Sequence, residues 1–286
     1  MLPNFLVIGA ARSGTTSLYH NLSLHPQIFM PLKKEPQFFT TNWHQGLDWY
    51  ARWFNARTIE LAVGEASMTY TYPAYATIAP ERIAQHLPDV RLIYLLRNPV
   101  ERTFSHYNYY RYYSQVEKRE FAEAIAEQEI YLGTSMYFEW IQRYLHYFKR
   151  EKLLVVIFED MIAHPVEELA KVFAFLEVNT AFTPLTAQTK TNATFKARNE
   201  TLFTLYRCFS LSRSRMWLES LVPQKARPFL RNKIRGVLGG QAKPPALSSD
   251  MQQHLSTYFE PEIQRLEFFL GRSLNVWRSG NNDGLR

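Results

Sequence analysis

Residues 5–18 read FLVIGAARSGTTSL, and this stretch decides the fold. Four apolar residues followed by Gly9 predict a buried parallel strand, and residues 15–24 predict a helix that begins directly after the turn. In such a turn several backbone N–H groups point to one place, and the helix dipole adds positive potential there. The stretch therefore predicts a seat for a phosphate or sulfate group.

The spacing of two glycines is that of a nucleotide-binding P-loop. The pattern G-x-x-x-x-G-K-[ST] is matched from Gly9 to Gly14, except that Thr15 stands where lysine is expected. That lysine reaches the β and γ phosphates of a triphosphate, so its absence disfavours an ordinary ATPase or kinase. A tight turn without a ligand is the structural alternative, since glycines often follow strands in α/β proteins.

Composition limits the class of protein. The chain has 286 residues, 46% of them hydrophobic, which is enough for a large core, and no Pro/Gly/Ser-rich linker divides it. The formal charge of +7 favours anionic ligands: a phosphorylated cofactor, a polyanionic acceptor, an acidic carrier or nucleic acid. The single cysteine, Cys208, excludes an intrachain disulfide and a cysteine-rich metal site.

No targeting or membrane segment is evident in the sequence. The first residues lack the basic stretch of a signal peptide, and Arg12 interrupts the apolar run that follows. No segment reaches the roughly 20 apolar residues that a membrane-spanning helix needs. We therefore expect a cytoplasmic protein without a membrane span.

Strand and helix patterns alternate along the rest of the chain. Further strands are predicted at residues 60–65, 90–96 and 153–158, and helices at 80–87, 136–148, 165–176 and 248–270. This order predicts an α/β fold with three layers, in which helices flank a mostly parallel central sheet of about four to five strands. We expect one domain over residues 1–286, with a nucleotide-binding α/β core at 1–180 and an irregular loop and helical part at 181–286.

Several motifs, in a fixed order, resemble those of the sulfotransferases that use 3′-phosphoadenosine-5′-phosphosulfate (PAPS). They lie at residues 8–16, 23–26, 34–39 and 95–102 with Ser105, and continue through Tyr137 and residues 158–160, 192–198 and 266–277. The branch most similar holds the heparan sulfate sulfotransferases and their bacterial relatives. This resemblance implies a P-loop-type fold and transfer of a sulfuryl group to a hydroxyl, with adenosine 3′,5′-bisphosphate (PAP) as product and no metal.

The resemblance also implies a set of donor-binding residues. Gly14, Thr15 and Thr16 match the positions that hold the 5′ phosphosulfate, and Arg97 and Ser105 match those that hold the 3′ phosphate. A guanidinium fork suits such an anion. The remaining residues expected around the nucleotide are Arg12, Ser13, Ser17, Tyr137, Lys196 and Arg198, the last two on a loop that closes over it in the family.

Glu35 matches the family position of the catalytic base, which takes the proton of the acceptor hydroxyl. Arg12 stands where the heparan-type enzymes carry a loop lysine. Arginine stays protonated, so it can offset developing charge but is a poor proton donor. Candidates for the acceptor side are Lys34, Glu65 and His106; Glu65 matches a family acidic position before a Ser/Thr-Pro pair, but Met68 replaces that proline.

Two other classes of function stay open. One is a P-loop enzyme related to nucleotide kinases, which the missing lysine and the lack of an evident magnesium-binding acid after a strand disfavour. The other is a non-catalytic module that binds anions or nucleic acid. Arg102 and its basic neighbours alternate with Glu101, Glu117 and Glu120, which favours a mixed-charge helix next to a buried strand over a base-stacking helix. We therefore expect as partners a nucleotide donor and a hydroxyl-bearing acceptor (a glycan, a carrier-bound acyl chain or a small molecule), and no nucleic acid.

Overall fold

The computed structural model describes residues 1–184, 196–197, 239–240 and 245–278. The described residues belong to two compact units. The first contains the predicted strands and most of the helices, and the second contains Tyr107–Arg119 with two short strands. The expectation that residues 1–286 form one domain stays a prediction.

The first unit is built on a parallel sheet of five strands, in the order β2-β3-β1-β4-β5. The strands are β1 (Phe5–Gly9), β2 (Ile28–Phe29), β3 (Ala62–Ala66), β4 (Arg91–Leu96) and β5 (Leu153–Ile157). The predicted α/β fold and strand number are confirmed. The two-residue strand β2 is not predicted, because its only strand feature is its pairing with β3.

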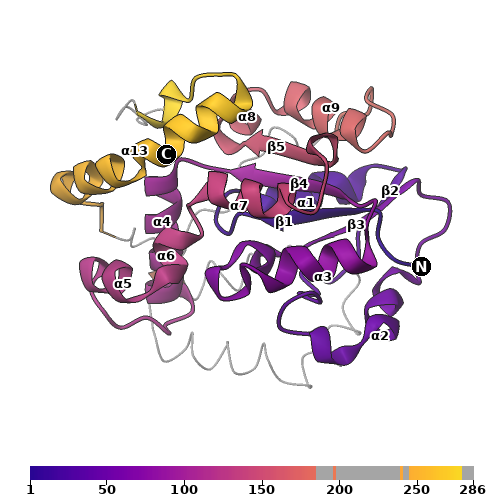
Figure 1. Ribbon diagram of the computed structural model, residues 1–286, viewed down its shortest axis with the longest axis horizontal. Helices are drawn as coiled ribbons and strands as arrows, with labels where there is room; N and C mark the ends of the chain where they lie inside the picture. The colour runs from indigo at the N-terminus through magenta and orange to yellow at the C-terminus, as the bar shows by residue number, and fades with distance from the viewer. Residues whose placement is uncertain (185–195, 198–238, 241–244, 279–286) are drawn as a thin grey trace. The chain divides into compact units, whose positions relative to one another are not determined.

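Helices lie close to the predicted positions at residues 15–24, 80–87, 136–148, 165–176 and 248–270, and the first unit has further helices besides (Figure 1). Together they are α1 (Thr15–Leu24), α2 (Leu47–Ala51), α3 (Ile78–His86), α4 (Pro99–Asn108), α5 (Phe121–Glu127), α6 (Glu129–Gly133), α7 (Tyr137–Leu145), α8 (Phe158–Ala163), α9 (Pro165–Phe175) and α13 (Ser249–Leu270). Helix α4 extends beyond this unit by its last two residues. Within residues 1–184 and 245–278, none of the helices combines the length and the apolar composition that crossing a bilayer requires.

Alternating side chains bury the sheet on both faces. Phe5 and Val7 of β1 belong to one apolar cluster together with residues of α1 and α9. Tyr94 of β4 points to the other face, where its ring packs edge-on against Tyr137 of α7 with centroids 6.0 Å apart. Strands covered on both faces are the reason for the continuous apolar runs in the sequence. Because all five strands are parallel, their carboxyl ends lie at one edge of the sheet.

The second unit is described only in part. Helical structure continues from α4 as one π-helical turn, Tyr109–Tyr113, labelled η5. Strands β6 (Lys196–Ala197) and β7 (Gly239–Gly240) pair antiparallel. The predicted donor residue Lys196 is thus placed on a strand by its backbone, whereas Arg198 lies outside the described residues.

Candidate active site

The turn between β1 and α1 has the backbone of an anion-binding loop. Gly14 precedes the helix with φ 90° and ψ 10°, a left-handed conformation that favours glycine. A Cβ atom at this position would lie 2.6 Å from the ring of Phe158. The N–H of Ala10 donates to the carbonyl oxygen of Leu95 at 2.7 Å, which fixes the loop to β4. Since the first N–H groups of α1 have no partner within the helix, they are available to an anion.

Lys34 brings a positive charge to this loop from a separate segment. Its Nζ atom donates to Oγ1 of Thr16 at 3.0 Å and to Oγ1 of Thr15 at 3.3 Å. The same atom forms an ion pair with Oε1 of Glu35 at 3.0 Å. The segment is fixed against α1 because the Tyr19 phenol donates to the carbonyl of Pro31. The predicted base Glu35 and the predicted donor residues are therefore linked through one ammonium group.

The chain turns sharply at Glu35 and Gln37, which have positive φ angles of 68° and 50°. Such angles are uncommon for residues other than glycine and cluster at functional sites. The Gln37 N–H donates to Oγ of Ser67 at 2.9 Å, and the Gln37 side-chain amide lies 3.4 Å from Oε2 of Glu35. Ser67 follows β3 directly, so the end of a buried strand holds the turn that carries Glu35.

Glu65 is a buried carboxyl group on β3, with 1% of its surface exposed. It accepts hydrogen bonds from Ser67 at 2.7 Å, Tyr70 at 2.6 Å and Tyr50 at 3.2 Å. Burial raises the pKa of Glu65 to about 7, although the three hydroxyl donors act in the opposite direction. The Ser67 hydroxyl contacts both this carboxyl and the Gln37 N–H, so it links Glu65 to the turn that carries Glu35.

Arg12, Arg97 and Ser105 come together beside the loop. Nε of Arg12 donates to Oγ of Ser105 at 3.2 Å, and a terminal nitrogen of Arg97 lies 3.4 Å from the carbonyl oxygen of Arg12. Arg97 also pairs with Glu101 at 3.0 Å and lies over the ring of Phe158, 5.1 Å from its centroid. The structure thus brings together the residues predicted for the two ends of the nucleotide.

The segment after β4 is anchored by a buried network that holds Arg97 in place. Oδ1 of Asn98 accepts from the N–H of Val100 at 3.0 Å and so caps α4, while Nδ2 of Asn98 donates to the carbonyl of Trp277 at 2.9 Å. Glu159 accepts from the Asn98 N–H at 2.9 Å and from the Trp277 indole at 2.8 Å. Burial raises the pKa of Glu159.

Tyr137 contributes to the same region from α7. Its phenol donates to the carbonyl of Arg97 at 2.7 Å, and burial raises the pKa of Tyr137 to about 12. Ser13 is also buried, and its Oγ has no hydrogen-bond partner among the described residues. Ser17 lies half-buried in the first turn of α1.

Arg102 belongs to the predicted mixed-charge helix, but its side chain lies in the core and not on the surface of that helix. It is fully buried, and its guanidinium donates to neutral acceptors: Ser135, Thr103, the carbonyls of Ala11 and Tyr131, and Nδ1 of His106. Since arginine is always the donor, the His106 ring carries its proton on Nε2. Burial lowers the pKa of His106 well below its ordinary value. The acceptor-side role of this neutral histidine stays a prediction.

Sequence reasoning missed three polar residues of the site: Gln37, Ser67 and Asn98. Ser67 lies just past the end of a predicted strand, and Asn98 follows the predicted strand that carries Arg97. Position at the carboxyl edge of a parallel sheet is the signal that would have pointed to both. For Gln37, the signal in the sequence is its position in the same motif as Glu35, residues 34–39.

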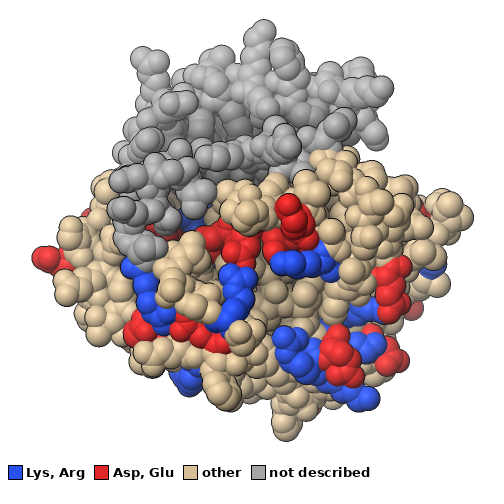
Figure 2. Space-filling model, turned by 90° about the horizontal axis from the view of Figure 1, so that it is seen from above, with Lys and Arg blue, Asp and Glu red and all other residues tan. Residues whose placement is uncertain are grey.

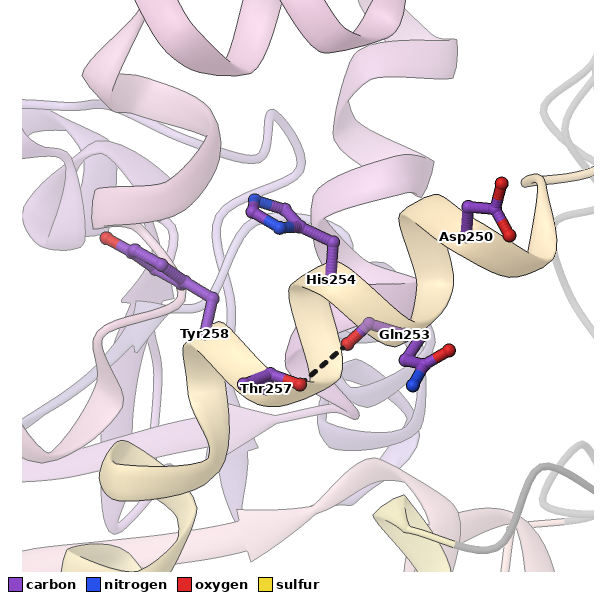
Figure 3. A pocket seen from close by; sticks show the side chains of 5 residues that line it. All are labelled: Asp250, Gln253, His254, Thr257 and Tyr258. Atoms are coloured by element: carbon purple, nitrogen blue, oxygen red, sulfur yellow. Dashed lines mark hydrogen bonds between the residues drawn. The ribbon is translucent and has the colours of Figure 1, made fainter.

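Other surfaces of the described residues give weaker indications of a ligand site than the β1–α1 loop. A depression of about 500 Å³ on α13 is lined by Asp250, Gln253, His254, Thr257 and Tyr258, all from one helix (Figure 3). Among the described residues on the face shown in Figure 2, Lys and Arg side chains lie beside Asp and Glu and form no continuous basic surface. Among the described residues, no group of three or more His, Cys, Asp or Glu side chains is arranged to hold a metal ion.

Comparisons with known proteins agree with this geometry. Residues 2–236 match the sulfotransferase domain family. The chain is 29% identical to the human bifunctional heparan sulfate N-deacetylase/N-sulfotransferase 3 over 96% of its own length and 31% of that enzyme. It is 30% identical to the mouse heparan sulfate glucosamine 3-O-sulfotransferase 3A1 over 61% of its length and 46% of that enzyme. The chain therefore spans less than half of either relative.

Among solved structures, a sulfotransferase from Alicyclobacillus acidocaldarius superposes with a TM-score of 0.70 and 26% identity, covering 97% of this chain and 99% of that one. The match extends over both the sheet and the segments that carry the site. An anion-binding loop without the P-loop lysine, cations from separate segments and a nearby carboxylate form one arrangement. The chain belongs to the sulfotransferase domain family.

Proposed function

We propose that the chain transfers a sulfuryl group from PAPS to a hydroxyl group of an acceptor, with Glu35 as the base. One observation carries the proposal: Glu35 is joined to the anion-binding loop by a single ammonium, that of Lys34, through contacts of 3.0 Å on either side. A base and a donor loop at this separation suit a direct transfer between two bound substrates.

The residues at the loop fit the donor. The buried Ser13 Oγ lacks a partner among the described residues, and Gly14 lets the loop backbone pack against the Phe158 ring, where a Cβ would clash. Free N–H groups of α1 suit the 5′ phosphosulfate, whereas Arg97 and Ser105 suit the 3′ phosphate. Thr15, Thr16, Ser17 and Tyr137 complete the described part of the proposed donor site.

When bound, the donor supplies a sulfuryl group whose bond to the 5′ phosphate oxygen breaks, with the electron pair kept by that oxygen, as the acceptor oxygen bonds to sulfur. Glu35 receives the acceptor's proton on a carboxylate oxygen. Arg12 lies beside the loop and offsets the negative charge that develops there. Its guanidinium stays protonated and supplies charge rather than a proton.

The proposal names the acceptor only by its chemical class, a molecule that carries a hydroxyl group. Two relatives are named for heparan sulfate, which makes a glycan hydroxyl one candidate. A carrier-bound acyl chain or a small-molecule alcohol are the others. Glu65, His106 and Lys34 are the acceptor-side candidates from the sequence, and cytoplasmic location also stays part of the proposal.

Calorimetry with PAP and ATP tests the donor site. We expect PAP to bind and ATP to bind far more weakly, because ATP lacks the 3′ phosphate that Arg97 and Ser105 are proposed to hold. Equal or tighter ATP binding would favour the kinase-like alternative. Tight DNA binding with a steep salt dependence would favour the nucleic-acid module.

Glu35→Gln tests the base. With donor carrying a labelled sulfuryl group and a pool of acceptors, we expect this variant to lose turnover by about a hundredfold or more. Its PAP affinity should stay within about twofold of the unmodified protein. Full turnover on the same acceptor would exclude Glu35 as the base.

A further inference from the structure

We infer that Lys34 is a donor-side residue whose ammonium contacts the 5′ phosphosulfate, and so replaces the P-loop lysine that Thr15 displaces. This inference rests on the proposed function. It assigns a sulfate- and phosphate-binding role to a residue that the sequence suggested for the acceptor side. It also adds residues 31–37 to the β1–α1 loop as a second segment at the site of the 5′ phosphosulfate.

The hydrogen bonds of Lys34 place it at the loop. An ammonium has three N–H donors. Two of them reach the hydroxyls of Thr15 and Thr16, at 3.3 and 3.0 Å, and the third faces Glu35 at 3.0 Å. Thr15 and Thr16 are the first two residues of α1, where the free N–H groups collect. An anion bound by those groups lies next to the Lys34 ammonium.

Burial and neighbouring charges agree with this position. Only 15% of the Lys34 side chain is exposed, and burial lowers the pKa of Lys34, with Arg12 acting in the same direction. Glu35 and Glu65 act in the opposite direction. Two cations held close together in a partly buried site are stabilised when an anion binds between or beside them.

The position between Glu35 and the loop also links the two charges that change during transfer. Glu35 loses its negative charge when it takes the acceptor proton, while the 5′ phosphate oxygen gains one. The Lys34 ammonium touches the first group and, in this inference, the second. The ammonium therefore stabilises the negative charge first on Glu35 and then on the phosphate oxygen, without movement of the Lys34 side chain. This is the behaviour of a preorganised electrostatic site.

Lys34→Gln tests the inference, and Lys33→Gln is the matched control. Lys33 is exposed and lies over the Trp53 ring, 5.6 Å from its centroid. The two ligands are PAP and adenosine 3′-monophosphate, which lacks the 5′ phosphate. We expect Lys34→Gln to weaken PAP binding by about tenfold or more, and to change binding of the monophosphate by less than about twofold. Lys33→Gln should change neither.

Full PAP affinity in a folded Lys34→Gln variant, with the loss confined to the KM for the acceptor, would overturn the inference and leave the proposed function standing. An unmodified protein that binds no PAP would overturn both. Because a variant can fail to fold, acetylation of the unmodified protein, followed by mass spectrometry, gives a second measurement. PAP should protect the Lys34 amine, while adenosine 3′-monophosphate should not, and Lys33 should stay reactive throughout. Equal labelling of Lys34 with and without PAP contradicts the inference.

Discussion

Nε of Arg12 lies 3.2 Å from the hydroxyl oxygen of Ser105, although 93 positions separate the two residues. Ser105 lies on α4, which follows β4, and Arg12 lies in the loop that follows β1. Since β1 and β4 are neighbouring parallel strands, both residues come to the same edge of the sheet. One hydroxyl thereby orients the loop arginine and remains beside the proposed 3′ phosphate site.

Ser105→Ala should weaken binding of PAP by about tenfold, because the variant loses a hydroxyl contact and the partner that orients Arg12. Adenosine 5′-monophosphate, which lacks the 3′ phosphate, should bind the variant and the unmodified protein within about threefold of each other. Calorimetry with both nucleotides measures this. Ser23→Ala, which removes an exposed hydroxyl bonded to the His20 carbonyl, is the control. Equal losses for the two nucleotides would place Ser105 away from the 3′ phosphate.

Gly14→Ala should unfold part of the site and abolish PAP binding. Alanine is strained at φ 90°, at a cost of about 1 kcal/mol, and its Cβ would also lie 2.6 Å from Phe158, the ring beneath Arg97. Gly46→Ala is the matched control, because Gly46 also has a positive φ, 77°, with nothing within 4 Å of the added atom. We expect the control to lose stability in urea but to keep its PAP affinity. Similar nucleotide binding by both variants would show that the contact with Phe158 is unimportant.

Glu65 predicts a pH dependence of stability. Its ordinary pKa is 4.5, and in the folded protein it is about 7, so the folded state binds the proton more tightly. The free energy of unfolding contributed by this group is therefore greatest below about pH 4.5, falls as the pH rises to about 7, and is constant above that. Glu65→Gln removes the titration.

Melting temperatures at pH 5 and pH 8 test this. The variant should gain stability relative to the unmodified protein as the pH rises between these values. A difference that stays constant, or changes in the other direction, contradicts the raised pKa. Ser67→Ala gives a useful comparison, because it breaks the link to the Glu35 turn while the carboxyl group remains.

Asn98→Ala should lower the free energy of unfolding by about 1–3 kcal/mol, because it removes the cap of α4 and the hydrogen bond to the Trp277 carbonyl. Asn98→Asp keeps an oxygen acceptor at the cap but loses the amide donor and places a second carboxyl group near Glu159. Chemical denaturation should therefore rank both variants below the unmodified protein. An alanine variant of unchanged stability would mean that water replaces both contacts.

Local patterns predicted the sheet and the loop well. Residues 5–9 and 15–24 form the expected strand and helix because apolar runs, glycine positions and helix starts are local signals. The resemblance to the sulfotransferases, which have these motifs in the same order, predicted that Arg12, Arg97 and Ser105 lie at one nucleotide site. These predictions needed no knowledge of side-chain contacts.

Contacts between distant segments were not predictable in the same way. Lys34 and Glu35 look like a surface ion pair in the sequence, and nothing local places the lysine on Thr16. Arg102 stands in a run of alternating charges, yet carbonyl and hydroxyl groups satisfy it in the core. The bond from Asn98 to Trp277 joins residues 179 positions apart. Tertiary packing decides such cases.

The contact of the Trp277 indole with Glu159 has a consequence for biosynthesis. The turn that holds Arg97 is completed by a residue made long after the sheet strands have left the ribosome. A nascent chain can therefore form the five-stranded sheet before Trp277 is available to stabilise this turn. The ability to bind the proposed nucleotide donor should therefore arise late in translation, once Trp277 has been made and has bonded to Glu159, which lies 118 positions earlier in the chain.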